Sequence, residues 1–214
     1  MKKVIIIDYG MGNLWSVESA LIYLGCDPII TDDIGVIENA KYLILPGVGS
    51  FRLAMKKLKA SGIDKAILNS IKDKDTRLLG ICLGMQLLGQ SSDEDGFTEG
   101  LKIIPIKFNI FKNKNNDPKI KIPHVGFNSV NFESDFELFN GLENNSEFYF
   151  VHSFRAKFDG VHKDSDFIYS SCNYSSEFIA AYSYGNIYGT QFHPEKSQTN
   201  GLIVLDNFIN QKIC

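Results

Sequence analysis

The first part of the chain alternates short apolar runs with longer stretches in which apolar residues recur every three or four positions. The runs are VIIID (4–8), PIIT (28–31), YLILPG (42–47) and RLLGI (77–81). Between the first two runs, Leu14, Val17, Leu21 and Leu24 have the spacing of one helix face. Apolar strands that alternate with amphipathic helices are typical of a parallel sheet covered by helices on both faces.

After about residue 100 the apolar runs become longer and turn residues separate them. The runs are IIPIKF (103–108), FYFVHSF (148–154), EFIAAYSY (177–184) and IYGTQF (187–192). The last two flank Gly185-Asn186, a pair that favours an antiparallel hairpin. The pattern therefore predicts an α/β fold with an open, mixed, mainly parallel sheet flanked by helices, extended by antiparallel strands in the second half.

Length and composition favour one globular domain over residues 1–214. Of the 214 residues 44% are hydrophobic and 22% are charged, and the net charge of −3 argues against a nucleic-acid partner. The apolar run at the N-terminus stops at Asp8, too early for a signal peptide or a membrane span, so we expect a cytoplasmic protein. The four histidines show no metal-ligand spacing, and we expect no metal or cofactor.

Three turns follow predicted parallel strands and are expected to meet at one edge of the sheet, where ligands bind in such folds. They are DYGMGN (8–13), LPGVGSF (45–51) and ICLGM (81–85). In the first turn Trp15 occupies the position of the third glycine of a dinucleotide fingerprint, so nicotinamide binding is disfavoured.

Cys82 lies between Gly80 and Gly84 where a strand is predicted to become a helix. Small neighbours permit a tight strand-turn-helix, and a helix N-terminus favours a thiolate. The alternative for this residue is a buried structural cysteine. The setting favours a nucleophile.

A general base for such a nucleophile is present in QFHPEKSQ (191–198), where His193 and Glu195 are two residues apart. If the segment is a strand, both side chains lie on one side, and the carboxylate orients the imidazole. This predicts a Cys-His-Glu triad. The glycine turn 46–50 and the N–H of Leu83 are expected to supply oxyanion donors. The alternative for the glycine turn is an ordinary strand-to-helix connection, and the alternative for HPE (193–195) is a surface turn.

These motifs identify a resemblance to the class I glutamine amidotransferases, and within them to the glutaminase subunits of imidazole glycerol phosphate synthases, the HisH type. The similarity extends end to end, through DYGMGNLWSV, LPGVGSF, GICLGMQLL, IPHVGFNSV, FYFVHSF and GTQFHPEKSQ in the family's order. GICLGMQLL together with HPEKSQ is highly specific.

The resemblance implies hydrolysis of L-glutamine through a thioester on Cys82, with His193 moving protons and Glu195 orienting it. Other family positions are matched by the oxyanion residue Val48 and by the glutamine-binding residues Gly49, Gln86, His152 and Ser153. In this family the peptide of the oxyanion residue can point away from the site until a partner binds. We therefore expect weak glutaminase activity in the isolated chain.

The resemblance also implies a heterodimer with a (βα)8-barrel synthase, which receives ammonia through a channel and makes imidazole glycerol phosphate and an aminoimidazole carboxamide ribotide in histidine biosynthesis. Tyr149, Lys196 and Phe127 match the docking face, although a lysine in a loop is also often simply solvated. Phe127 stands where tryptophan is usual at the family's partner interface, and Phe154 where tyrosine is common, which removes a hydroxyl near the glutamine pocket. These departures leave open a related glutaminase that supplies ammonia for an acetamidino group on a surface sugar.

Other interpretations have weaker support. A non-catalytic subunit would be expected to lack a triad member, and a cysteine peptidase of related fold would not explain HPEKS. His124 is interpreted as a satisfied turn histidine or an interface residue, and His162 as a surface residue. Cys26, Cys172 and Cys214 match no catalytic position.

Overall fold

The computed structural model describes residues 1–111, 121–156 and 167–210. Most of the predicted polar loop at 111–119, as well as His162 and Cys214, lies outside the described residues.

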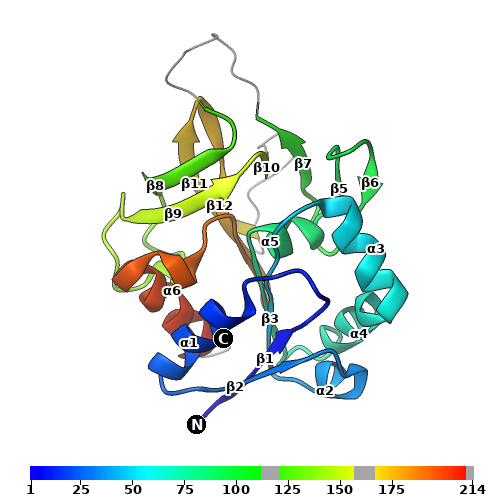
Figure 1. Cartoon of the computed structure of the whole chain (residues 1–214). Helices are drawn as coiled ribbons and strands as arrows, with labels where there is room; N and C mark the ends of the chain where they lie inside the picture. Colours follow the sequence, from blue (N-terminus) through cyan, green and yellow to red (C-terminus); the bar gives the residue numbers. More distant parts are fainter. Residues whose placement is uncertain (112–120, 157–166, 211–214) are drawn as a thin grey trace.

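The first half of the chain forms parallel strands joined by helices (Figure 1). The strands are β1 (Lys3–Ile7), β2 (Asp27–Thr31), β3 (Tyr42–Leu45) and β4 (Arg77–Ile81). The helices are α1 (Leu14–Tyr23), α2 (Ile34–Glu38), α3 (Phe51–Ser61), α4 (Ile63–Ser70) and α5 (Leu83–Leu87). The strands lie side by side in the order β2-β1-β3-β4 and every neighbouring pair is parallel, as the alternating pattern predicts.

The second half extends this sheet mainly with antiparallel strands. Its elements are β5 (Ser91–Ser92), β6 (Thr98–Glu99), β7 (Lys107–Ile110), β8 (His124–Ser129), η1 (Glu137–Phe139), β9 (Glu147–His152), β10 (Phe154–Ala156), β11 (Phe167–Tyr174), β12 (Ser176–Tyr184), β13 (Ile187–Thr190), η2 (Pro194–Lys196) and α6 (Gln198–Asn210). Strands β12 and β13 form the predicted hairpin, and β13 pairs in parallel with β4. The mixed α/β sheet is therefore confirmed, and β8 and β9 form a separate two-stranded sheet.

Helices cover both faces of the sheet because alternate strand residues point to opposite sides. In β1, Ile5 and Ile7 pack in one apolar cluster and Val4 and Ile6 in the other. The first cluster receives the buried residues of α2, α3, α4 and α5, and the second those of α1 and α6. Figure 1 shows α1 and α6 on one side and α2, α3 and α4 on the other.

The turns after β1, β3 and β4 meet at one edge of the sheet, as expected from their sequence positions. Gly47 packs so closely there that a Cβ atom would lie 2.6 Å from the Tyr9 hydroxyl and 2.8 Å from the Gly84 nitrogen. Lys57 donates from Nζ to the carbonyl of Gly10 at 3.1 Å. This edge therefore carries the predicted turns in mutual contact.

Several local expectations were incomplete or wrong. Helices α2 and α4 were not predicted, and FYFVHSF is divided at Ser153 into β9 and β10. The segment that carries His193 and Glu195 is not a strand, because β13 ends at Thr190 and Pro194–Lys196 is a short 3-10 helix. In the parts of the chain that are described, no helix combines the length and apolar character needed to cross a bilayer.

Candidate active site

Cys82 occupies a strained backbone position between β4 and α5. Its φ of 53° and ψ of −108° lie in a region that favours glycine, and its N–H is held by the Thr190 carbonyl at 2.7 Å. A Cβ at Gly80 would lie 2.6 Å from the Met85 nitrogen, and one at Gly84 would overlap the Leu45 carbonyl. The two glycines therefore allow the tight turn that exposes the sulfur to a pocket, although Cys82 itself is only 6% exposed.

His193 and Glu195 are paired through the 3-10 turn at η2. Nδ1 of His193 lies 2.8 Å from Oε1 of Glu195, and the two side chains are 2% and 1% exposed. The turn is held by Ser197, whose hydroxyl donates to the His193 carbonyl at 2.7 Å. The predicted pairing is present, but Pro194 and the 3-10 geometry produce it, where the sequence argument assumed strand periodicity.

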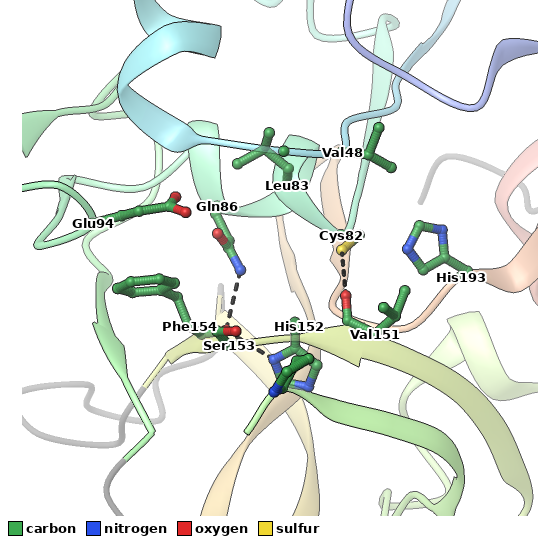
Figure 2. A pocket seen from close by; sticks show the side chains of 12 residues that line it. Val48, Cys82, Leu83, Gln86, Glu94, Val151, His152, Ser153, Phe154 and His193 are labelled. Atoms are coloured by element: carbon green, nitrogen blue, oxygen red, sulfur yellow. Dashed lines mark hydrogen bonds between the residues drawn. The ribbon is translucent and has the colours of Figure 1, made fainter. Parts of the chain in front are cut away.

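The charges around His193 favour its protonated form. Burial lowers the pKa of His193, but the nearby Cys82 sulfur and the hydrogen-bonded Glu195 carboxylate outweigh it and raise the pKa to about 10. Nε2 of His193 makes no hydrogen bond to a described residue, so this nitrogen is available to sulfur and substrate. In this structure the thiol instead approaches the Val151 carbonyl at 3.8 Å (Figure 2).

The two predicted oxyanion donors are not aligned with one another. The Leu83 N–H donates to the Gly47 carbonyl at 3.4 Å. Because the C=O and N–H of a trans peptide point in opposite directions, the Val48 N–H is directed away from Leu83. The Leu83 N–H, next to the predicted nucleophile Cys82, is thus already bonded to the Gly47 carbonyl of the glycine turn.

A cavity of about 280 Å³ brings most of the predicted residues together. Its lining includes the predicted Val48, Gly49, Cys82, Leu83, Gln86, His152, Ser153 and His193. It also includes Phe154, which was expected near the glutamine pocket, and three residues that the sequence argument did not assign to a site, namely Glu94, Pro123 and Val151. Figure 2 shows Cys82 facing this space between Gln86 and His193. This volume is sufficient for a single free amino acid as ligand.

Two buried glutamine side chains connect the pocket wall to the sulfur. Gln86 donates from Nε2 to the Phe154 carbonyl at 3.2 Å and to Oε1 of Gln191 at 3.0 Å. Gln191 in turn donates from Nε2 to Cys82 Sγ at 3.7 Å. Sequence reasoning missed Gln191, although it lies two residues before His193 in the same motif.

Glu94 places a half-buried carboxylate on the pocket wall. Its Oε2 accepts from the N–H of Phe51 at 2.7 Å, at the first residue of α3. Burial raises the pKa of Glu94, and the neighbouring Asp95 and Asp93 add to this. The carboxylate suits an ammonium group of a ligand. Sequence reasoning missed it because the run DED is typical of a solvated loop.

The predicted docking residues lie next to the triad. Phe127 on β8 is 46% exposed, and its ring centre lies 5.6 Å from that of Tyr149 on β9. The Tyr149 carbonyl accepts from the N–H of His193 at 2.9 Å. Lys196 is exposed on η2, immediately after Glu195. An exposed surface therefore adjoins His193 and Glu195.

His124 differs from both of its sequence interpretations. It is the first residue of β8 and is 2% exposed, so it is neither a turn residue nor a surface residue. Cys26 and Cys172 are buried thiols outside the pocket, and burial raises the pKa of each. In the described ranges no group of three or more His, Cys, Asp or Glu residues is arranged to hold a metal ion.

Comparison with known proteins finds relatives over nearly the whole chain. The family model described as "Glutamine amidotransferase class-I" matches residues 5–211. A Parasynechococcus marenigrum protein named "Imidazole glycerol phosphate synthase subunit HisH 1" is 46% identical, covering 98% of each chain. A Methanococcus maripaludis protein named "Imidazole glycerol phosphate synthase subunit HisH 2" is 45% identical over 97% of this chain and 99% of its own.

Among solved structures, a putative GMP synthase protein from Thermoplasma acidophilum has a TM-score of 0.70. It is 22% identical and covers 98% of this chain and 92% of its own. This likeness shows the fold alone.

Proposed function

This chain belongs to the class-I glutamine amidotransferase family, and from that premise we propose that it is the glutaminase subunit of imidazole glycerol phosphate synthase in histidine biosynthesis. The HisH relatives are 40–46% identical over nearly the whole chain. The alternative, a glutaminase for surface-sugar amidination, rested on Phe127 and Phe154 and is not favoured, because the relatives that match nearly the whole chain are named as imidazole glycerol phosphate synthase subunits.

The first half of the reaction is thioester formation. The Cys82 thiolate attacks the side-chain amide carbon of L-glutamine, and the C–S bond forms as the carbonyl oxygen becomes an oxyanion. His193, protonated because Cys82 and Glu195 raise its pKa, donates Nε2–H to the amide nitrogen. The C–N bond then breaks, and ammonia leaves.

The second half returns the enzyme to its starting state. Neutral His193 takes a proton from water, which attacks the thioester carbon, and the C–S bond breaks to release glutamate. Glu195 keeps Nδ1 protonated throughout, so Nε2 is the nitrogen that exchanges protons.

The pocket supplies groups for the rest of the glutamine molecule. Gly49, Gln86, His152 and Ser153 line the cavity together with Cys82 and His193, and Glu94 offers a carboxylate to the α-ammonium group. Gln86 is held by two acceptors, so its amide is already oriented before glutamine binds.

The oxyanion turn makes the chain a weak enzyme by itself. While the Gly47 carbonyl occupies the Leu83 N–H, a developing oxyanion meets a carbonyl in place of two donors. Rotation of the Gly47–Val48 peptide would bring the Val48 N–H beside that of Leu83. We propose that docking of a (βα)8-barrel synthase on the surface of Phe127, Tyr149 and Lys196 favours this rotation and receives the ammonia through a channel.

The observation that carries this proposal is the strained Cys82 in one pocket with the buried His193–Glu195 pair. The test is glutamate release from glutamine by the chain mixed with the histidine-pathway barrel subunit of the same organism, with and without the ribotide substrate. We expect strong stimulation linked to imidazole glycerol phosphate formation.

Cys82→Ala is the matched control for this assay. It should abolish glutamate release and leave binding of the barrel intact, because the sulfur lies in the pocket and not on the docking surface. Background activity in the wild type with this barrel, together with stimulation by a different one, would refute the pathway assignment.

A further inference from the structure

A buried pair of histidines lies directly behind the glutamine pocket. His124 on β8 is the register partner of His152 on β9, and they are 2% and 6% exposed. Paired residues of neighbouring strands point to the same face, and here Nδ1 of His124 lies 3.1 Å from Nε2 of His152. Two imidazoles therefore share one hydrogen bond in the interior.

The partners of the pair determine which nitrogen carries each proton. Nδ1 of His152 lies 2.8 Å from the Phe154 carbonyl, which only accepts, so Nδ1 is the protonated nitrogen. Burial lowers the pKa of His152 to about 3 and that of His124 to about 4, so both rings are neutral. Nε2 of His152 is then an acceptor, and Nδ1–H of His124 must be its donor.

The remaining nitrogen of His124 completes the same pattern. Nε2 lies 3.4 Å from Nδ2 of Asn128, whose Oδ1 accepts from the Ser129 N–H at 2.9 Å. The amide orientation of Asn128 is therefore defined, and its NH2 group donates to His124. Every bond in the series runs in one direction, from Asn128 to the Phe154 carbonyl.

Aromatic rings prevent His124 from turning out of this arrangement. Its ring is stacked between Tyr174 at 3.9 Å and Phe150 at 4.9 Å, measured between ring centres. Phe111 and Phe178 surround His152 at 5.1 and 5.2 Å. Both imidazoles are thus held in place by packing as well as by hydrogen bonds.

The end of the series is part of the pocket. The Phe154 carbonyl accepts from His152 and also from Gln86 Nε2, and all three residues line the cavity with Ser153, at the interruption between β9 and β10 (Figure 2). We propose, on the basis of the proposed function, that His124 is a positioning residue for glutamine. By donating to Nε2 it holds His152 as the Nδ1–H tautomer, and so keeps the β9–β10 corner and Gln86 in the geometry that binds substrate.

The first test is the tautomer of His152 in the wild-type chain, read by nitrogen NMR of protein labelled with ¹⁵N-histidine. We expect protonated Nδ1 and unprotonated Nε2 on both His124 and His152. An Nε2–H tautomer on His152 would overturn the proposal. This measurement needs no turnover, so failure of the proposed function, seen as no glutamate release with the barrel, is distinguishable from failure of this inference.

The second test compares His124→Phe with His124→Asn in the barrel-stimulated assay. Phe keeps the aromatic stack and removes the donor, so we expect KM for glutamine to rise about tenfold with a smaller change in kcat. Asn places an amide nitrogen near the Nδ1 position and should restore KM and the His152 tautomer. Ser129→Ala, on the other face of β8, is the control and should change neither.

An unchanged KM and tautomer in His124→Phe would show that His124 has only a packing role. If His124→Phe does not fold, the wild-type tautomer and the KM of His124→Asn still decide the matter, because a raised KM in His124→Asn with His152 still in the Nδ1–H form would also overturn the proposal.

Discussion

At the scale of single residues, the active site depends on buried ionisable and polar groups, whose protonation and hydrogen bonding are determined by their neighbours. His193 shows this most directly, since the negative charges of Cys82 and Glu195 raise its pKa to about 10 against the opposing effect of burial. Gln191 contacts the same sulfur, as an uncharged hydrogen-bond donor through Nε2. Glu195 is two residues from His193 in the sequence, but Cys82 comes close to His193 and Gln191 only after folding.

The contribution of Cys82 to the charge state of His193 can be measured with Cys82→Ser. A serine hydroxyl stays neutral, so the pKa of His193 should fall clearly below its wild-type value of about 10, as followed by NMR titration of the imidazole. Cys26→Ser, a buried thiol elsewhere, should leave it unchanged. An unaltered pKa in Cys82→Ser would contradict the assigned cause.

The same shift predicts how stability depends on pH. The folded-state pKa of His193 exceeds the unfolded value of about 6.5, so the folded state binds this proton more tightly. Its contribution to stability is complete below about pH 6.5 and is lost as the pH rises toward 10. This loss should be smaller in Cys82→Ser, measured by denaturant unfolding across that range.

Gln191 is expected to orient both Gln86 and the sulfur. Gln191→Leu removes a donor to Cys82 Sγ and an acceptor for Gln86, and we expect glutaminase kcat/KM to fall about tenfold. The control is Gln90→Leu, at a partly buried glutamine whose side chain does not line the pocket. Equal effects of the two substitutions would argue against a specific role for Gln191.

At the scale of elements, the site is built where three turns at the carboxyl ends of parallel strands touch. The oxyanion turn after β3 packs on the N-terminal turn of α5 and on Tyr9 after β1, with no room for a side chain at Gly47. Cys82 and the proposed oxyanion donors Val48 and Leu83 are therefore positioned by contacts between segments far apart in the sequence.

Gly47→Ala tests this close packing. The added methyl group would meet the Tyr9 hydroxyl, the Gly84 nitrogen and the Leu83 Cβ at 2.6 to 2.9 Å, so we expect a loss of about 1–3 kcal/mol in the free energy of unfolding. Tyr9→Phe removes one of these clashes and should recover part of the loss in the double variant. Gly35→Ala in α2 is the control and should cost clearly less, because a Cβ there would meet only the side-chain Oδ1 of Asp33, at 3.3 Å. Additive effects of Gly47→Ala and Tyr9→Phe would contradict direct contact.

At the scale of the whole molecule, the two-stranded β8–β9 sheet joins the pocket to the outer surface. One face of β8 buries His124, and the other exposes Val125 and Phe127, which are 55% and 46% exposed. Only the strand β8 therefore separates the surface proposed for docking from His124, which contacts the pocket residue His152.

Phe127→Ala should weaken binding of the barrel by about tenfold or more, because an exposed aromatic residue beside Tyr149 is a typical interface anchor. Lys196→Ala is expected to weaken it as well, and the Kd of this variant should depend less on salt than that of the wild type, because the charge that salt screens has been removed. Lys72→Ala, beyond the amino end of β4, is the matched control for an exposed lysine. The measurement is the Kd by calorimetry, and unchanged values in both variants would refute the docking surface.

Much of the fold was predictable from the sequence, because the spacing of apolar residues indicates which side chains are buried, and so was the pairing of His193 with Glu195. The spacing of Leu14, Val17 and Leu21 predicted α1. The setting of Cys82 between glycines predicted a tight turn, and the positive φ of 53° at Cys82 is the backbone conformation of such a turn. His193 and Glu195 were paired correctly on wrong reasoning, because a 3-10 helix, not a strand, brings them together.

What the sequence determined by itself is most of the parallel strands, the helices α1, α3 and α6, the glycine-lined turns and the candidate reactive side chains, since these follow from local spacing and chemistry. Tertiary structure alone decided that Glu94 lies on the pocket wall, that Gln191 reaches the sulfur, that the Gly47 carbonyl occupies the Leu83 N–H, and that His124 is buried against His152. Each of these joins residues distant in the sequence. No local pattern encodes such a contact, because its energy depends on burial and on distances that exist only once the sheets have packed.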